Sequence, residues 1–138
     1  MKLKIPAIIY TGALVQAHLH LFSVYFLLAI FLVESTFRWD AKGDYGPGDP
    51  NRFPGDPFWY PDDRGLYPHS FGLGQLHVDG AGSGHRPAEL LDITNNIVWS
   101  GKYLSSCLAG FPVYCHTGSI NTSAGSFCYL RTHAVARY

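Results

Sequence analysis

The chain carries little charge and has no surplus of either sign. Ten Lys and Arg residues balance ten Asp and Glu residues, and charged residues make up 14% of 138 positions, against about 25% in typical soluble domains. Without a basic surplus the chain cannot neutralise many phosphates, so the composition argues against a nucleic-acid partner. The length fits a single domain.

Cysteine is scarce and lacks the paired spacing of metal and redox motifs. Cys107, Cys115 and Cys128 form no C-x-x-C or C-x-x-C-H sequence. This pattern excludes c-type haem attachment, zinc ribbons and thioredoxin-like sites. The odd number argues against a closed disulfide framework but allows one disulfide, so it does not determine the redox compartment.

Charge is absent altogether from residues 5–33, which contain no Asp, Glu, Lys or Arg. As one continuous helix this segment would be about 43 Å long, more than the ~30 Å hydrocarbon core of a bilayer. We therefore predict an integral membrane protein of mainly α class, with an N-terminal tail at 1–4 and a transmembrane helix at 5–33. Two other interpretations stay open: a secretory leader cleaved after Ala17, and a buried helix of a soluble protein.

Glycine and proline dominate the chain after the predicted helix. Nine of the nineteen residues in 43–61 are Gly or Pro, which disfavours helices and central strands. We predict an extended, largely irregular strap over 34–86, with a short strand near 75–78. Its aromatic residues are expected to pack on a partner surface at the membrane interface, where Trp and Tyr are favoured; they are Trp39, Tyr45, Phe53, Phe58, Trp59 and Tyr60.

The C-terminal third is more regular at its start than at its end. Pro87 and Glu89 suit the first turn of a helix, so helical segments are predicted within 87–118. Residues 101–117 are mostly apolar and small, and they form a candidate second, short membrane helix that Pro112 would kink. The tail, 119–138, shows no clear period.

Two histidines lie inside the apolar segment. Ionisable groups within a membrane usually face a protein interior or a ligand, so His18 and His20 are candidate axial ligands to chlorophyll or haem. They point about 200° apart on a helix and cannot share one metal. The alternative is a neutral histidine that hydrogen-bonds a neighbouring subunit. Gln16, Glu34 and Arg38 are predicted to make polar contacts along and at the exit of this helix.

A second group of histidines recurs every eight residues in the glycine-rich region. His69, His77 and His85, with Asp79 nearby, can assemble a zinc site because loop imidazoles and carboxylates are zinc ligands. The spacing matches no standard zinc motif, and solvent-exposed or interfacial histidines are the alternative. Nucleophilic catalysis has little support, since no Ser stands in a G-x-S-x-G elbow. We predict that the chain is not an enzyme.

Several short motifs resemble those of chlorophyll-binding light-harvesting antenna proteins. That family has a membrane helix ending in Glu, a following Arg-Trp, a Pro/Gly-rich loop, and a second helix with a Gly-Arg and a Gly-Phe. Motifs in a similar order here are Glu34, Arg38-Trp39, Asp40, Pro47-Gly48, Asp56-Pro57-Phe58, Tyr67-Pro68, Gly101-Lys102, Gly110-Phe111 and Thr117-Gly118. The resemblance spans about residues 20–120 and implies bound chlorophyll and carotenoid.

The chain departs from that family's pattern at several positions. Ile97 stands where the family has a chlorophyll-ligating Glu, and Lys102 replaces the Arg. The step from Glu34 to Arg38 is one residue too long, and the family's first helix has no counterpart. These departures put the ligand set of the second helix in doubt.

The sequence thus favours a non-enzymatic small subunit of a larger energy-transducing complex, photosynthetic or respiratory. Its expected partners are larger membrane subunits, lipids and pigments, and its expected location is a thylakoid or another energy-transducing membrane. Three alternatives stay open. They are a pigment-binding antenna polypeptide, a membrane-anchored metal-binding protein or enzyme that uses the loop histidines, and a secreted domain released from its leader.

Overall fold

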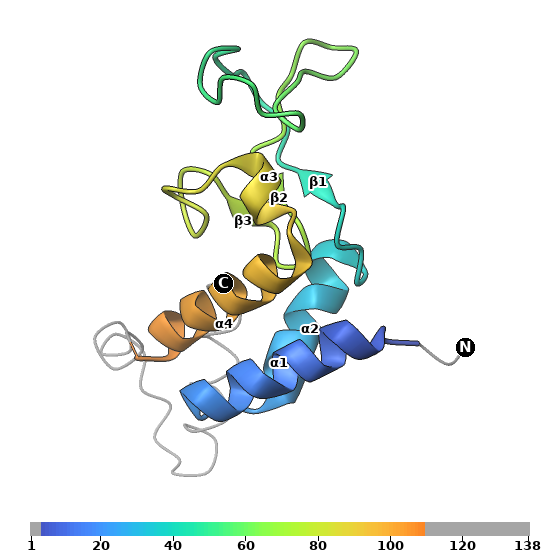
Figure 1. The fold of residues 1–138 in the computed structure, drawn as a ribbon, viewed down its shortest axis with the longest axis vertical. Coiled ribbons are helices and arrows are strands. Elements are labelled where there is room, and N and C mark those ends of the chain that lie inside the picture. Colours follow the sequence, from blue (N-terminus) through green and yellow to red (C-terminus); the bar gives the residue numbers. More distant parts are fainter. Residues whose placement is uncertain (1–3, 110–138) are drawn as a thin grey trace, which may run out of the picture.

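The apolar N-terminal segment forms two helices rather than one. The structure, a computed structural model, describes residues 4–109; α1 spans Ala7–His20 and α2 spans Val24–Ser35 (Figure 1). Leu21 ends α1 in the left-handed conformation with φ 57°, and Ser23 begins α2 with an extended backbone. Ser is a favoured residue before a helix, so Ser23 is the one local signal for this break.

The prediction of a mainly α membrane protein with a transmembrane helix at 5–33 is wrong. At the rise of an α-helix, α1 and α2 are about 21 Å and 18 Å long, well short of a ~30 Å hydrocarbon core. Within residues 4–109, no helix combines the length and apolar character needed to cross a membrane. The predicted integral membrane location, thylakoid or other, is corrected by the same finding. Residues 101–109 of the second candidate membrane segment belong to α4 (Ile93–Ala109), and 110–117 lie outside the described residues.

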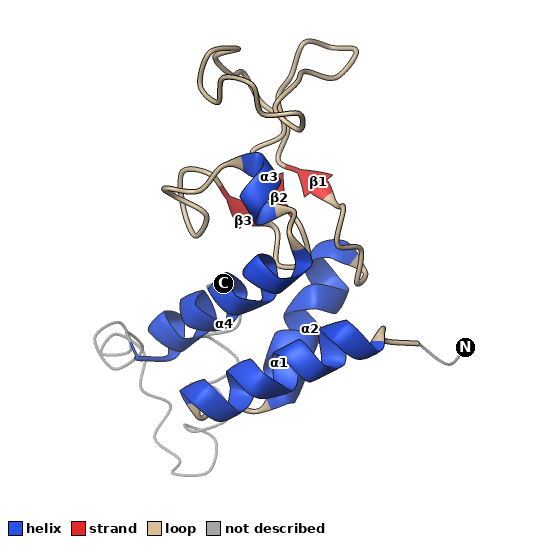
Figure 2. Cartoon of the chain, in the orientation of Figure 1, coloured by secondary structure: helices blue, strands red, loops and turns tan. Residues whose placement is uncertain are grey.

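The region after α2 contains a small antiparallel sheet, which the predicted fold class did not include. Its strands are β1 (Lys42–Gly43), β2 (Ser70–Phe71) and β3 (Leu76–His77), in the order β1-β2-β3. Lys42 pairs with Phe71, and Ser70 pairs with His77. The rest of 36–86 consists of turns and loops (Figure 2), and β3 falls within the predicted strand segment. The short helix α3 (Pro87–Leu90) precedes α4.

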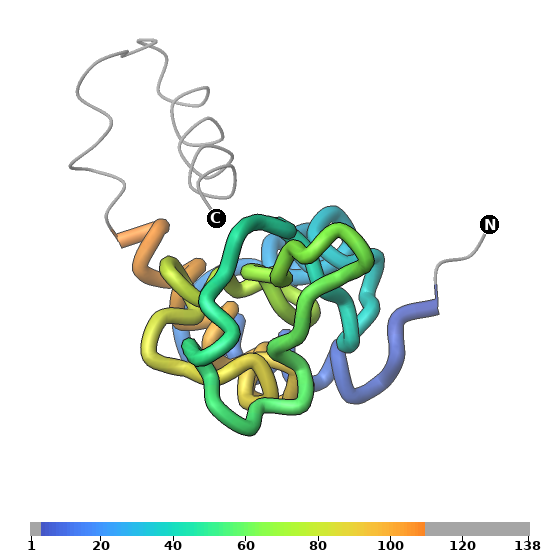
Figure 3. Tube along the Cα trace, turned by 90° about the horizontal axis from the view of Figure 1, so that it is seen from above, coloured from blue at the N-terminus to red at the C-terminus, as the bar shows by residue number. Residues whose placement is uncertain are grey.

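The described chain has a helical layer and a layer of loops and short strands. In Figure 1, α1 and α4 lie below the sheet, and the segment around residues 45–65 projects farthest from α1. Figure 3 looks onto that loop layer, with residues 45–70 in front. One apolar core joins α1, α2 and α4, and a second lies under the loops. Its buried residues are Trp59, Tyr67, Phe71, Leu76, Val78, Leu90 and Leu91.

A single buried amide connects the two layers. Asn96, on α4, is 1% exposed. Its Nδ2 donates to the carbonyl oxygens of Phe71 (3.0 Å) and Leu90 (2.7 Å), and its Oδ1 accepts from the backbone N–H of Gly74 (2.9 Å) and the hydroxyl of Ser100 (3.4 Å). These four bonds use both donors and both acceptor positions of the amide. The helix α4 is thereby fastened to the β2–β3 turn and to the end of α3.

Replacing Leu21 with Gly distinguishes the helix break from a continuous helix. Leu21 is 86% exposed and lies in a left-handed conformation that Gly adopts without steric cost, so L21G should raise the free energy of unfolding by about 0.5–1 kcal/mol. L19G, at an exposed position inside α1, should lower it by about 1 kcal/mol. Urea denaturation measures both values. Equal destabilisation by the two variants would contradict a break at Leu21.

Removal of the Asn96 amide should cost more than any other polar substitution in α4. N96A leaves two buried carbonyls and a buried N–H without partners, and we expect a loss of about 2–4 kcal/mol in the free energy of unfolding. N95A, at the neighbouring half-buried position, should change it by less than about 1 kcal/mol. Thermal and urea unfolding provide the measurement. A loss of stability no larger for N96A than for N95A would refute the role given to Asn96.

Candidate metal centre

The β2–β3 hairpin brings three of the four predicted metal ligands together. His69 immediately precedes β2, His77 lies in β3, and Asp79 follows it by two residues. The pairing of Ser70 with His77, and the bond from the Val78 N–H to the His69 carbonyl (2.8 Å), fix the two histidines at neighbouring positions. One ligand atom from each of the three residues lies within 4.8 Å of the others.

The ring orientation of His69 suits a ligand. Its Nε2 lies 3.1 Å from the Pro47 carbonyl, so this nitrogen carries the proton and donates. The other nitrogen, Nδ1, keeps its lone pair and lies 3.8 Å from an oxygen of Asp79. A histidine that donates one N–H to a carbonyl and offers the other nitrogen is the usual arrangement of a metal ligand.

His77 and His69 are stacked, and the ring of His77 is also hydrogen-bonded. The ring centroids lie 5.6 Å apart with an angle of 20° between the planes. The Asp79 backbone N–H donates to Nδ1 of His77 at 3.1 Å. In this neutral form the proton of His77 is on Nε2. Coordination by His77 therefore costs that backbone bond, because Nδ1 either binds the metal itself or takes over the proton when Nε2 binds it.

Aromatic residues of the loop layer support the histidine pair from one side. The Trp59 ring meets His69 edge-on, with centroids 5.6 Å apart, and packs on Tyr67 at 4.9 Å. Tyr67 and Gly46 exchange two backbone hydrogen bonds, which brings the Pro47 carbonyl next to His69. The imidazole of His69 is therefore held by both a hydrogen bond and aromatic packing, with 13% of its side chain exposed.

Arg52 is the functional neighbour that the sequence did not reveal. Its guanidinium forms a two-bond ion pair with Asp79, one of the contacts being 3.1 Å from Nη1 to Oδ2. These hydrogen bonds hold the pKa of the Asp79 carboxyl below its usual value, and the nearby His77 and His69 add a smaller effect in the same direction. Arg52 lies 27 positions from Asp79 in an irregular loop, and no short motif connects the two.

His85, the fourth predicted ligand, is not part of this cluster. Its ring stacks on Trp99 with centroids 3.7 Å apart, and its Nδ1 lies 4.0 Å from Glu89. The predicted helix histidines are separate as well. His18 is exposed on α1, and His20 is half-buried at the end of α1, where it stacks on Phe22 at 6.2 Å.

The polar residues predicted along the apolar segment lie apart from one another. Gln16 is buried between α1 and α4, against Gly101. Arg38 pairs with Asp40 (3.4 Å) rather than with Glu34. Glu34 lies in the last turn of α2. Partial desolvation of its carboxyl, and secondarily the nearby Asp44 carboxylate, raise its pKa.

The predicted interface aromatics divide into two groups. Phe53 and Trp59 pack edge-on at 5.0 Å within the second core. Tyr45, Phe58, Tyr60 and Trp39 line a hollow of about 540 Å³ that also includes Lys42, whose ammonium lies 4.2 Å from the Tyr60 ring centroid. Phe58 also packs against the second core, and the interface role of these aromatic residues stays a prediction.

Comparison with models of known protein families, with curated proteins and with solved structures found no match for this chain. The expected photosynthetic, light-harvesting role is corrected, since it required a membrane helix that residues 4–109 lack. Three expectations stay predictions: the resemblance to antenna proteins, the binding of chlorophyll, carotenoid or haem, and the absence of enzymatic activity. Of the described residues, His69, His77 and Asp79 remain the set best arranged to bind a metal.

The raised pKa of Glu34 predicts that Glu34→Gln increases the free energy of unfolding by an amount that depends on pH. A carboxyl whose pKa is raised by folding stabilises the folded state at pH values below its unfolded pKa of about 4.5. This stabilisation is lost as the pH rises through the folded-state pKa. E34Q should therefore stabilise the protein at about pH 7 by up to about 0.5 kcal/mol, with no gain at about pH 3. Its position at a helix C-terminus adds to the effect.

Urea denaturation of the wild type and E34Q at both pH values measures this gain. Most of the gain in stability should persist when Asp44 is also replaced by Asn, because burial raises the pKa of Glu34 more than the Asp44 charge does. A gain that is the same at both pH values would contradict the argument.

Proposed function

We propose that this chain binds one divalent transition-metal ion, of the zinc class, through His69, His77 and Asp79. The observation that supports the proposal is the convergence of two imidazoles and one carboxylate, with ligand atoms within 4.8 Å of one another. Nitrogen and carboxylate oxygen are ligands of Zn²⁺ and of neighbouring first-row metals. Three protein ligands leave a fourth position for water or a group from another molecule.

Metal binding requires the ligands to move closer together. In a tetrahedral zinc site with bonds of about 2.0 Å, ligand atoms lie about 3.3 Å apart. The three atoms here therefore have to approach one another by up to about 1.5 Å, which side-chain rotation supplies. The hairpin backbone, fixed by strand pairing, does not have to change.

Two existing interactions compete with the metal. Arg52 takes a lone pair on each oxygen of Asp79, so a metal has to use the remaining lone pairs or displace one of these bonds. The bond from the Asp79 N–H to Nδ1 of His77 is lost whichever ring nitrogen binds the metal, because Nδ1 is then either a ligand or protonated. Arg52 also places a positive charge beside the cation, which weakens binding further. The affinity should therefore be lower than that of a preformed four-ligand zinc site.

This competition gives a test in which variants of the same cluster change metal affinity in opposite directions. H69A and H77A each remove a ligand and should weaken Zn²⁺ binding at least about tenfold. R52Q frees Asp79 and removes a like charge, so it should tighten Zn²⁺ binding, by about threefold to tenfold. H85A, outside the cluster, should leave the affinity unchanged.

Isothermal titration of the full chain with Zn²⁺ gives affinity and stoichiometry. Absorption of the Co²⁺-substituted protein reports tetrahedral coordination, and circular dichroism checks that each variant is folded. A stoichiometry of one that is lost in H69A and H77A supports the proposal. Weaker binding in R52Q, or an equal loss in H85A, would refute it and leave Arg52, Asp79 and His69 as a purely structural network.

A further inference from the structure

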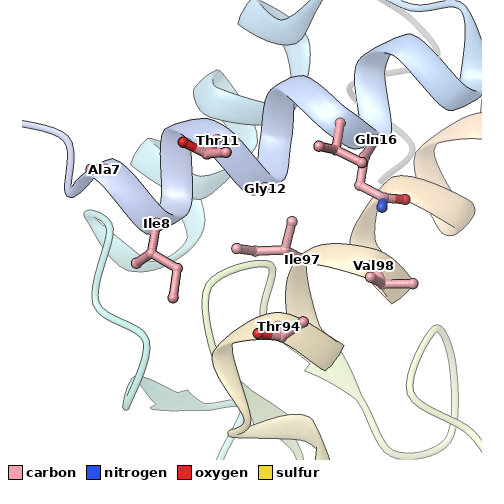
Figure 4. A pocket seen from close by; sticks show the side chains of 9 residues that line it. Ala7, Ile8, Thr11, Gly12, Gln16, Thr94, Ile97 and Val98 are labelled. Carbon is pink, nitrogen blue, oxygen red and sulfur yellow. The ribbon is translucent and has the colours of Figure 1, made fainter.

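A groove with no charged residues runs along the helical layer between α1 and α4. It has a volume of about 490 Å³ and follows α1 from Ala7 to Gln16, about 14 Å by the helical rise. Its other wall is the first half of α4, and Figure 4 shows the side chains of both helices around it. The lining residues are Ala7, Ile8, Thr11, Gly12, Val15, Gln16, Thr94, Ile97 and Val98.

Two glycines shape this groove. Gly12 faces Ile97, and a Cβ at Gly12 would lie 3.0 Å from the Ile97 Cδ1 atom, so the missing side chain lets Ile97 pack closely against α1. Gly101 lies against the side chain of Gln16, where a Cβ would be 2.8 Å from the Gln16 Cβ. The helices therefore approach closely at Gln16 and close the groove at that end.

The side chain at the closed end is a buried amide without a partner. Gln16 is 5% exposed and extends from α1 toward α4 near Val98 (Figure 4). Within residues 4–109, the four other buried polar side chains each have a hydrogen bond. They are Ser35, Ser70, Asn96 and Ser100. The Gln16 amide has none among these residues, although buried polar groups in native proteins are nearly always paired.

We propose that the groove binds an uncharged amphiphilic small molecule, with its polar group on Gln16 and its apolar body along Ile8, Ile97 and Val98. An amide both donates and accepts, so it pairs with a hydroxyl, carbonyl or amide. No cationic side chain lines the groove, so a carboxylate or phosphate head would be buried without a counter-charge. The volume lies in the range of small-molecule pockets, which often form between packed helices.

Titration of the full chain with 1-decanol, followed by NMR of ¹³C-labelled Ile methyl groups, tests this proposal. The methyl groups of Ile8 and Ile97 should shift, while Ile30, buried in α2 outside the groove, should not. Decanoate carries the same chain with a charged head, and it should bind at least about tenfold more weakly at about pH 7. This readout is independent of metal binding, so it can fail while the metal proposal stands.

Replacement of Gln16 by Leu keeps the volume and removes the polar group. Q16L should remain folded, since an apolar side chain suits an apolar groove, and should bind 1-decanol at least about fivefold more weakly. L19Q, on the exposed side of α1, is the control and should bind as the wild type does. V98F should fill the groove and abolish the Ile97 shift, which provides a second test if Q16L is unstable.

Three results would overturn the proposal. One is equal binding of decanoate and 1-decanol, and another is unchanged binding by Q16L. The third is the absence of any decanol shift at Ile8 and Ile97, as expected if a second copy or residues 110–138 of this chain cover the groove. Size-exclusion chromatography at two protein concentrations identifies the second copy in that case.

Discussion

The buried amide of Asn96 is the constraint on which the arrangement of this chain depends. Neither layer is extensive: the strands have two residues each, and isolated hairpins of this size are marginally stable in water. The turn of the hairpin becomes rigid because Gly74 and Phe71 bond to a side chain of α4. Gly72 is required there, since its φ is +76° and a Cβ would collide with the Asn96 amide. A helix thus sets the position of a hairpin that could not hold its own register.

This anchoring carries through to the metal cluster. His69 and His77 stand on the two arms of the hairpin whose turn Asn96 fixes, so their separation is set by the helical layer rather than by the loops. The loops supply the polar environment: the Pro47 carbonyl orients one ring, and Arg52 neutralises Asp79. The backbone framework of the cluster and its polar environment therefore come from different parts of the sequence.

Composition predicted a mostly irregular region after the apolar segment, but it missed the small sheet there and was wrong on the apolar segment itself. The eight-residue recurrence suggested His69, His77 and His85 together with Asp79. The separation of His85 from the other three depends on its stacking with Trp99, a contact between distant residues. The break at Leu21 was hidden because neither Gly nor Pro marks it, and tertiary packing of α1 on α4 outweighs the local preference for helix. The uninterrupted apolar composition suggested one long helix. The chain instead reverses after α1, and the two short helices share one core.

The two buried amides of the helical layer show how one chemical group can serve two purposes. Asn96 is satisfied by four bonds and gains nothing from a ligand, so it can only stabilise. Gln16, which is also buried, has no such partner within residues 4–109. Keeping a polar side chain there costs stability unless something pairs with it. Leucine would fill the same space at lower cost, so the presence of glutamine at the closed end of an uncharged groove is best explained by a molecule that enters it.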